Sequence, residues 1–279
     1  MKGKIGFYLI IVALAAIAGF YIYQSTRSVS GTFSVGQSLG IEKDNITGLK
    51  LKSKTLTIEL KKQDSVWMLV QPVNETADQN RVKALLNLIS DTKMISPISD
   101  NPDKQHLFGV DTSGNRLTIH TDKTDYSFMI GTDGSDHQTT YLRRPESNDV
   151  AVFSGLFAEF FSPAVMYRDK TLLKTDEKKL TGVELTANDT TQHFTKDAAG
   201  WKIDGQVIVS EKVYPFESSM MSLDATDLVD SVKAEAITFP RTVHLVVSAG
   251  KTTELNFYKL PERPEYWVTK PGSRQVYLI

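Results

Sequence analysis

The sequence predicts an α+β protein in which an N-terminal transmembrane helix precedes two tandem copies of a mainly antiparallel strand-strand-helix-strand-strand-strand unit. An uncharged apolar run lies near the N-terminus, and two blocks of sequence recur later in the chain. Within these blocks apolar and polar residues alternate, which is typical of hairpins grouped around a helix. We therefore assign 1–24 to a cytoplasmic tip and anchor, 25–44 to a linker, 45–165 to the first repeat and 166–279 to the second.

Composition narrows the possible activities. The 279 residues are 41% hydrophobic, with 32 basic residues against 33 acidic ones and no cysteine. The absence of cysteine excludes disulfides, thiolate metal sites and a cysteine nucleophile. A near-zero net charge without a long basic run argues against nucleic acid as a partner.

The predicted anchor is residues 7–23, "FYLIIVALAAIAGFYIY". No charged residue lies between Lys4 and Arg27. Seventeen helical residues reach about 26 Å, close to the roughly 30 Å of a hydrocarbon core. Lys2 and Lys4 favour a cytoplasmic N-terminus. We expect a single-pass protein of the bacterial inner membrane whose C-terminal body is extracytoplasmic.

A cleaved signal peptide is the alternative to an anchor. Its apolar region usually has about 7–15 residues and ends at a cleavage site of small residues. Here triplets such as Ala13-Leu14-Ala15 lie inside the apolar run, with large aromatic residues after them. We therefore expect that the anchor is not cleaved.

The segment after the anchor, up to Asp44, is rich in Ser, Thr and Gly. It has no sustained periodicity, which indicates a linker or a loosely packed first segment. Gly36 to Gly40 fits the G-x-S-x-G pattern of serine hydrolases. That chemistry needs a strand before the serine and a helix after it, and the flanking sequence predicts neither.

The first block of the duplication pairs Asn45–Leu60 with Lys179–Phe194 and Trp67 with Trp201. Each copy has alternating apolar residues, a turn, and a second alternating run through the tryptophan, which predicts a hairpin. A helix follows in each copy, because apolar residues recur at the spacing of one helix face. These residues are Val82, Leu85, Leu86 and Ile89 in the first copy and Phe216, Met220 and Leu223 in the second, with Asp78 and Ser210 as expected N-caps.

The second block resumes after the helices. "LTIHT" at Leu117–Thr121 matches "VHLVV" at Val243–Val247, and Thr140–Phe153 matches Tyr266–Ile279 without a gap. The first copy has eight more residues before this block, in the region Gln105–Ser113. We call residues 105–113 the inserted segment.

Four phenylalanines lie between the two copies, at spacings that fit one face of a helix that Pro163 ends. This face is expected to be a core seam joining the copies, or a docking surface for a partner if it is exposed. The residues are Phe153, Phe157, Phe160 and Phe161.

The tryptophans have two interpretations as well. Trp67 and Trp201 occupy matching positions, which favours a role in the core or in hairpin packing. The alternative is a groove between the copies in which Trp67, Trp201 or Trp267 stacks on an envelope polysaccharide or peptide.

Five stretches resemble the domain of unknown function family 4340, membrane-tethered bacterial proteins associated with ABC-type transporters of the gliding-motility kind. The tryptophan stretch, "FGVD" and "YRDKTLL" are its most specific part. The stretches are "VWMLVQPVNETADQNRVKALLNLI" (Val66–Ile89), "HLFGVD" (His106–Asp111), "MIGTD" (Met129–Asp133), "TYLRR" (Thr140–Arg144) and "YRDKTLL" (Tyr167–Leu173).

The resemblance implies an accessory protein that acts beside a transporter, with a permease or its extracytoplasmic subunit as partner. It implies no catalytic residue and no cofactor. We expect a non-enzymatic protein, with an envelope polysaccharide- or peptide-binding module as the alternative, and an enzyme with an unrecognised site as a third.

Overall fold

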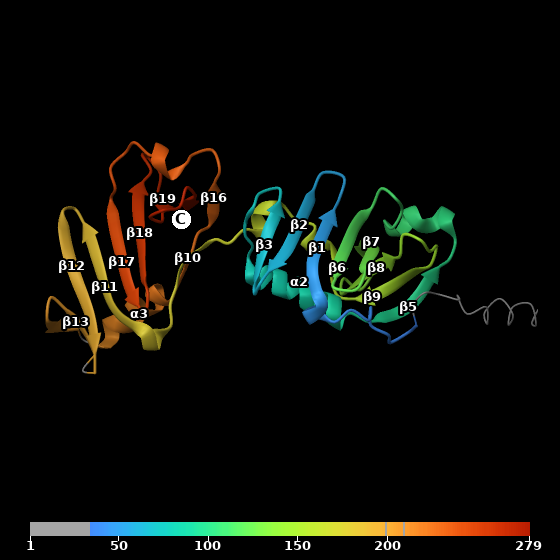
Figure 1. Ribbon diagram of the computed structural model, residues 1–279, viewed down its shortest axis with the longest axis horizontal. Coiled ribbons are helices and arrows are strands. Elements are labelled where there is room, and N and C mark those ends of the chain that lie inside the picture. The colour runs from blue at the N-terminus through green and yellow to red at the C-terminus, as the bar shows by residue number, and fades with distance from the viewer. Residues whose placement is uncertain (1–33, 199, 209) are drawn as a thin grey trace, which may run out of the picture. The chain divides into compact units, whose positions relative to one another are not determined.

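The computed structural model describes residues 34–279 except 199 and 209, and Figure 1 shows its elements. The chain divides into two compact units, with the boundary between Arg168 and Asp169. Among the described residues, no helix is long and apolar enough to cross a membrane. The predicted anchor at 7–23 lies outside them, as does the linker up to residue 33.

The first unit contains a sheet for which the described residues supply nine strands, all antiparallel to their neighbours, in the order β4-β3-β2-β1-β6-β7-β8-β9-β5. The strands are β1 Ile46–Lys52, β2 Thr57–Gln63, β3 Val66–Gln71, β4 Glu75–Thr76, β5 Met94–Ser99, β6 Asn115–Thr121, β7 Asp125–Asp133, β8 Thr139–Arg143 and β9 Val150–Ser154. Helix α2 (Gln79–Asp91) lies between β4 and β5 in the chain.

The second unit repeats this order as β14-β13-β12-β11-β17-β18-β19-β20-β16, with α3 (Ser210–Met221) after β14. The strands are β11 Leu180–Ala187, β12 Thr190–Asp197, β13 Gly200–Ile203, β14 Gln206–Val207, β16 Asp227–Val229, β17 Val243–Ala249, β18 Thr252–Lys259, β19 Tyr266–Thr269 and β20 Val276–Leu278, and a separate ribbon pairs β10 Thr171–Lys174 with β15 Ser222–Asp224. The shared order confirms two tandem, mainly antiparallel units.

The strand count differs from the expected five per unit. Two of the strands that were missed are β4 (Glu75–Thr76), which is short, and β5 (Met94–Ser99), which pairs with the distant β9. Two residues are too few to show an alternating pattern. In β5, Pro97 and two register shifts interrupt the pattern as well.

The match between Leu117–Thr121 and Val243–Val247 is wrong by two residues. In β1 Leu51 pairs with Leu117, whereas its counterpart Leu185 in β11 pairs with Leu245. Alternation has a period of two, so a shift of two residues keeps every apolar side chain on the same face. The apolar pattern alone therefore could not detect the error.

The linker assignment is also wrong for residues 34–44, which pack on the first unit. Met94 exchanges backbone hydrogen bonds with Gly36 and Gln37, and Leu39 and Ile41 are buried. The 3₁₀ helix η1 (Lys43–Asn45) follows, just as η5 (Glu177–Lys179) follows β10 in the second unit. The first repeat thus begins by residue 36.

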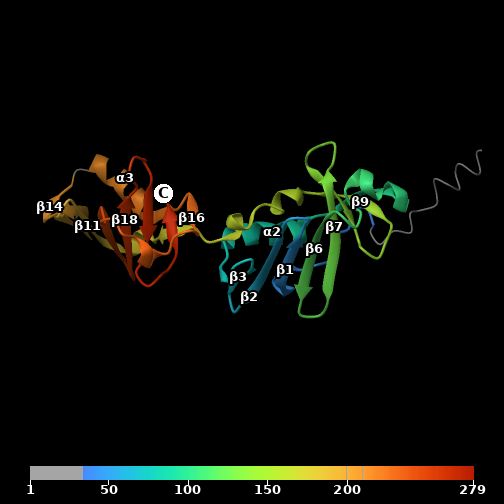
Figure 2. The same ribbon diagram turned by 90° about the horizontal axis from the view of Figure 1, so that it is seen from above.

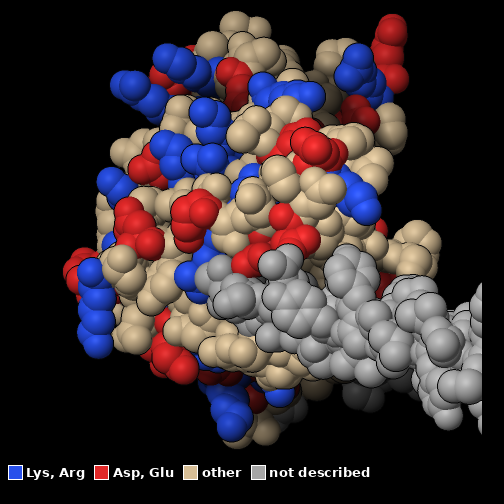
Figure 3. Space-filling view, turned by 90° about the vertical axis from the view of Figure 1, so that its right-hand side faces the viewer, with Lys and Arg blue, Asp and Glu red and all other residues tan. Residues whose placement is uncertain are grey.

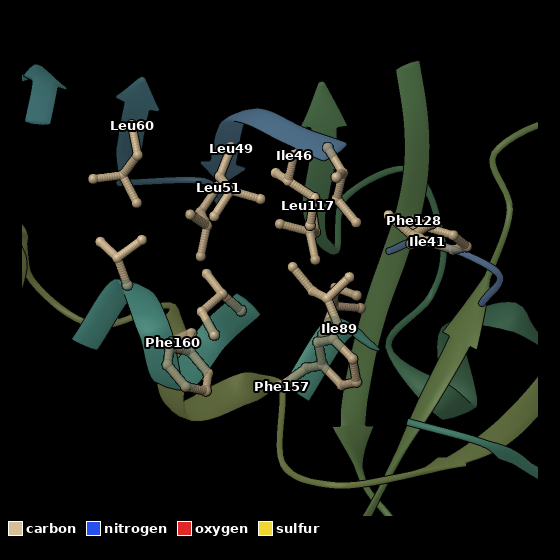
Figure 4. Packing of buried hydrophobic residues seen from close by; sticks show 14 of the residues in the cluster. Ile41, Ile46, Leu49, Leu51, Leu60, Ile89, Leu117, Phe128, Phe157 and Phe160 are labelled. Atoms are coloured by element: carbon tan, nitrogen blue, oxygen red, sulfur yellow. The ribbon is translucent and has the colours of Figure 1, made fainter. Parts of the chain in front are cut away.

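The core of the first unit lies between one face of its sheet and α2 (Figure 2). Leu49, Leu51 and Leu60 point from the sheet toward α2, as Figure 4 shows. Asp78 caps α2 by accepting from the backbone N–H groups of Asn80 and Arg81, as predicted.

The opposite face of this sheet is polar over β1, β2 and β6 but covered near β7–β9. The 3₁₀ helix η2 (Pro102–Phe108) and the residues after it place Val110 against Met129 and Val150. A Cβ at Gly131 would collide with the carbonyl oxygen of Phe108, so this close approach requires glycine. The inserted segment thus builds a small second core.

Candidate functional site

The predicted aromatic face does not exist as a helix. Phe153 lies in β9, and only Ala158–Phe160 forms a short 3₁₀ helix, η3, after Phe157. Pairing of β9 with both β8 and β5 holds Phe153 in the sheet, which a helix would prevent. Phe153, Phe157 and Phe160 are buried within the first core, where Figure 4 shows Phe157 beside Ile89. These three side chains are therefore core residues of the first unit, and Phe161 packs partly buried against them.

Arg81 of α2 closes this part of the core. Its guanidinium lies 5.0 Å from the Phe160 ring centre and 5.1 Å from that of Tyr167. The Tyr167 hydroxyl donates to the Phe160 carbonyl at 2.6 Å, and burial raises the pKa of Tyr167. The neighbouring Arg168 is buried and forms a two-bond ion pair with Glu75 at 2.7 and 2.8 Å. Both residues of the "YR" pair therefore have structural partners.

Trp67 and Trp201 are core residues, with 6% and 2% of their surface exposed. The backbone N–H and C=O of Trp67 bond to the side chain of Gln79, at 3.0 and 2.9 Å. The structure thus confirms the core interpretation, and neither ring is free to stack on a ligand.

Trp201 differs from Trp67 in its polar partner. Its indole N–H donates to Glu217 of α3 at 2.6 Å, and Lys196 contacts the same carboxylate at 2.6 Å. The hydrogen bonds from Lys196 and then Trp201 lower the pKa of Glu217.

Trp267 is half-buried and serves as a packing residue of the second unit. Its ring lies 5.3 Å from that of Phe239, as the Tyr141 ring in the first unit lies 5.0 Å from that of Phe108. Trp267 and Tyr141 occupy equivalent positions in β19 and β8. An aromatic contact on this face of the sheet is thus common to both units, although the second unit lacks the inserted segment.

The strongest candidate site is a surface hollow of about 390 Å³ in the first unit, which we call the basic hollow. The turn from β1 to β2 forms one side, and the end of the inserted segment with the start of β6 forms the other. Met129 lies at its base and is buried. Apart from Gly114, the remaining lining is basic or hydroxylic: Lys52, Lys54 and Arg116 with Ser53, Thr112 and Ser113.

Arg143 holds the inserted segment beside this hollow. It is buried, and its Nε donates to the Val110 carbonyl at 2.9 Å. Its Nη1 donates to the carbonyl oxygens of Arg144, Pro145 and Ser147 at 2.8 to 3.2 Å. One guanidinium thereby fastens the inserted segment to the turn after β8. Burial, and next the charge of Arg116, lower the pKa of Arg143.

No ion pair balances the charge of the basic hollow. Within residues 34–279 that the structure describes, Lys52, Lys54 and Arg116 form no ion pair. The nearby Asp111 carboxylate accepts from the Ser113 hydroxyl and backbone at 2.7 and 2.9 Å. These bonds, and to a smaller extent the charge of Lys54, lower its pKa.

A second hollow, of about 580 Å³, lies in the second unit. It carries Lys174, Lys251 and Lys270, but Asp169 and Glu254 line it as well. Lys270 already donates to the Thr171 carbonyl at 2.6 Å, and burial is the main cause that lowers its pKa. Its mixed charges make it a weaker candidate for a charged ligand.

On the face in Figure 3, Lys and Arg side chains lie among Asp and Glu side chains. No group of three or more His, Asp or Glu side chains that could hold a metal occurs in the described part of the chain. The residues of the basic hollow escaped sequence reasoning, because Lys52 and Arg116 are 64 positions apart in the chain. Only the pairing of β1 with β6 brings them together.

Comparison with known proteins places the chain in a family. No curated protein and no solved structure matches it significantly. The family model described as "Domain of unknown function (DUF4340)" matches residues 67–245, from β3 of the first unit to β17 of the second. This match spans both units and more than half of the chain. The chain therefore belongs to the DUF4340 family of domains of unknown function.

Proposed function

We propose that this protein is a non-enzymatic, membrane-anchored accessory protein whose two units lie outside the cytoplasmic membrane of a bacterium. The observation that carries the proposal is the uncharged stretch at 7–23, followed by two sheet units of one topology. Lys2 and Lys4 before that stretch favour an extracytoplasmic body.

An auxiliary role in an ABC-type transport system is the more specific form of the proposal. It draws on the resemblance at "HLFGVD" and "YRDKTLL", stretches that lie within the family match. A permease or its extracytoplasmic subunit is the partner we propose. Non-enzymatic function is supported by the side chains with shifted pKa values, because Tyr167, Glu217 and Arg143 each have structural partners.

The alternative, an envelope polysaccharide- or peptide-binding module, gains no support from the tryptophans. Trp67 and Trp201 lie in the two cores, and Trp267 packs on Phe239. A ligand would have to bind elsewhere on the units.

The partner is tested by purifying a C-terminally tagged full chain from membranes in mild detergent and identifying what accompanies it by mass spectrometry. We expect a transporter permease or its ATPase in stoichiometric amount. A matched control replaces residues 7–23 with an unrelated membrane-spanning helix, which keeps the tether and both units. Recovery of the chain alone would contradict the transporter role.

The absence of cysteine allows a clean test of topology. Ser135 lies in the exposed β7–β8 turn, so Ser135→Cys should react with a membrane-impermeant maleimide in intact cells. Gly3→Cys should react only after the cells are permeabilised. The reverse pattern would overturn the proposed orientation while leaving the accessory role to the purification experiment.

A further inference from the structure

The basic hollow places two cations directly opposite each other on neighbouring strands. Lys52 at the end of β1 is the register partner of Arg116 in β6. Like charges at opposed positions of an antiparallel pair destabilise a sheet. The folding of the first unit gains nothing from this arrangement, and no described carboxylate forms an ion pair that would offset it.

The second unit shows that the fold does not need these charges. The register position of Lys52 and Arg116 is taken there by Thr186 and His244. His244 contacts the Glu254 carboxylate at 2.8 Å, and Asn188 stands where the first unit has Lys54. The same backbone is therefore built without a cluster of cations that lack ion pairs.

The donors that remain free suit an anion with several oxygens. Lysine supplies a compact charge and arginine a planar fork, and both are suited to phosphate. Ser53 Oγ accepts from the backbone N–H of Leu56 at 3.1 Å, which leaves its own proton to donate. A dianion would neutralise more of the positive charge of the three side chains than a monoanion would.

We propose that the basic hollow of the first unit is a binding site for a phosphate group, held by Lys52, Lys54 and Arg116 with Ser53 as a further donor. The phosphate belongs either to a soluble phosphate compound or to the headgroup of an anionic lipid. This site does not depend on the transporter association proposed above.

The test uses the full chain in mild detergent and measures hydrogen exchange along the chain during titration with inorganic phosphate at about pH 8, where the dianion predominates. Chloride keeps the ionic strength constant. We expect phosphate to protect residues 53–56 and 112–116. A second arm replaces inorganic phosphate with phosphatidic acid in the micelles, with phosphatidylcholine as the neutral lipid. Stronger protection by phosphatidic acid assigns the site to a headgroup, and protection by inorganic phosphate alone assigns it to a soluble compound.

Single variants connect the effect to the hollow. Lys52→Gln and Arg116→Gln should each weaken phosphate binding about fivefold, and the double variant about 25-fold if the effects add. Lys123→Gln, which removes the same charge from the other end of the β6–β7 hairpin, should leave binding unchanged. Each hollow variant should also keep or raise the melting temperature of the first unit, because it removes a repulsion.

Three results would overturn the proposal. The first is that neither inorganic phosphate nor phosphatidic acid protects residues 53–56 and 112–116 more than chloride does. The second is equal weakening by Lys123→Gln and by the hollow variants. The third is a fall in melting temperature of Lys52→Gln and Arg116→Gln that accounts for their loss of binding.

Discussion

The two units share a strand order but differ in what covers the face of the sheet away from the helix. In the first unit the inserted segment buries Val110 and is fastened by Arg143. In the second unit a shorter segment contributes Phe239, which packs on Trp267, and Thr269 stands at the position of Arg143. An aromatic contact is thus common to both, whereas the buried arginine and the basic hollow belong to the first alone.

This difference distinguishes the structural features that the shared fold requires from those that are present in one unit. Two copies of one topology provide an internal control, because a feature present in both is required by the shared architecture. The tryptophans are such a feature, and both are buried. The cations at Lys52 and Arg116 are not, and they oppose folding. A function specific to one unit is therefore best sought at the inserted segment.

The largest expected effects come from the two tryptophans. Trp67→Ala and Trp201→Ala should each destabilise their own unit by about 3–5 kcal/mol, because each leaves a large cavity in a core. Hydrogen exchange of the full chain reports the two units separately. Trp267→Ala should cost less, because this ring is only half-buried. An equal loss at Trp267 would contradict the assignment of Trp67 and Trp201 as the core pair.

Arg143→Met should come next, with a loss of about 2–4 kcal/mol in the first unit. The substitution leaves the buried carbonyl of Val110 and its neighbours without their donor. Faster hydrogen exchange should appear in residues 105–113. Thr269→Val at the equivalent position of the second unit is the matched control, and it should not loosen the first unit. Unchanged exchange in the inserted segment would show that Arg143 does not hold it.

Glu217→Gln should destabilise the second unit by about 1–2 kcal/mol at neutral pH, because hydrogen bonds from Lys196 and Trp201 favour the charged carboxylate. The folded-state pKa of Glu217 lies below its usual 4.5. Its contribution is therefore complete above that value and is lost as the pH falls through the folded-state pKa.

Thermal unfolding between pH 7 and pH 3 checks this prediction. The difference between wild type and Glu217→Gln should shrink toward pH 3. Lys83 is a charged residue of α2, and Lys83→Gln should show no comparable change in the first unit. A difference that stays constant with pH would mean that the charge of Glu217 is unimportant.

The smallest expected effect is at the start of α2. Asp78→Ala removes two hydrogen bonds to the backbone N–H groups of Asn80 and Arg81 and should cost about 1 kcal/mol. Asp78→Asn, which keeps an acceptor, should restore most of it. Exchange of the first helical turn is the measurement, and equal losses in both variants would point to a role other than capping.

The duplication could be predicted from local patterns in the sequence. Matched alternation around Trp67 and Trp201 led to two antiparallel units, and a helical period with Asp78 as cap led to α2. The residue spacing of the four phenylalanines led to a wrong helix, because Phe153 is drawn into β9 by strands on both sides. Residue spacing alone does not show which strands pair with the segment that contains a residue.

By itself, then, the sequence determined the presence of two similar units, their antiparallel character and the burial of their tryptophans, since a period of two or 3.6 residues reports locally which face is apolar. Only the tertiary structure decided how β5 returns to β9, how residues 34–44 join the first repeat, and how Lys52 comes to face Arg116. These are contacts between distant segments. A shift of two residues leaves every alternation unchanged, so only the packed sheet selects the register that builds the basic hollow.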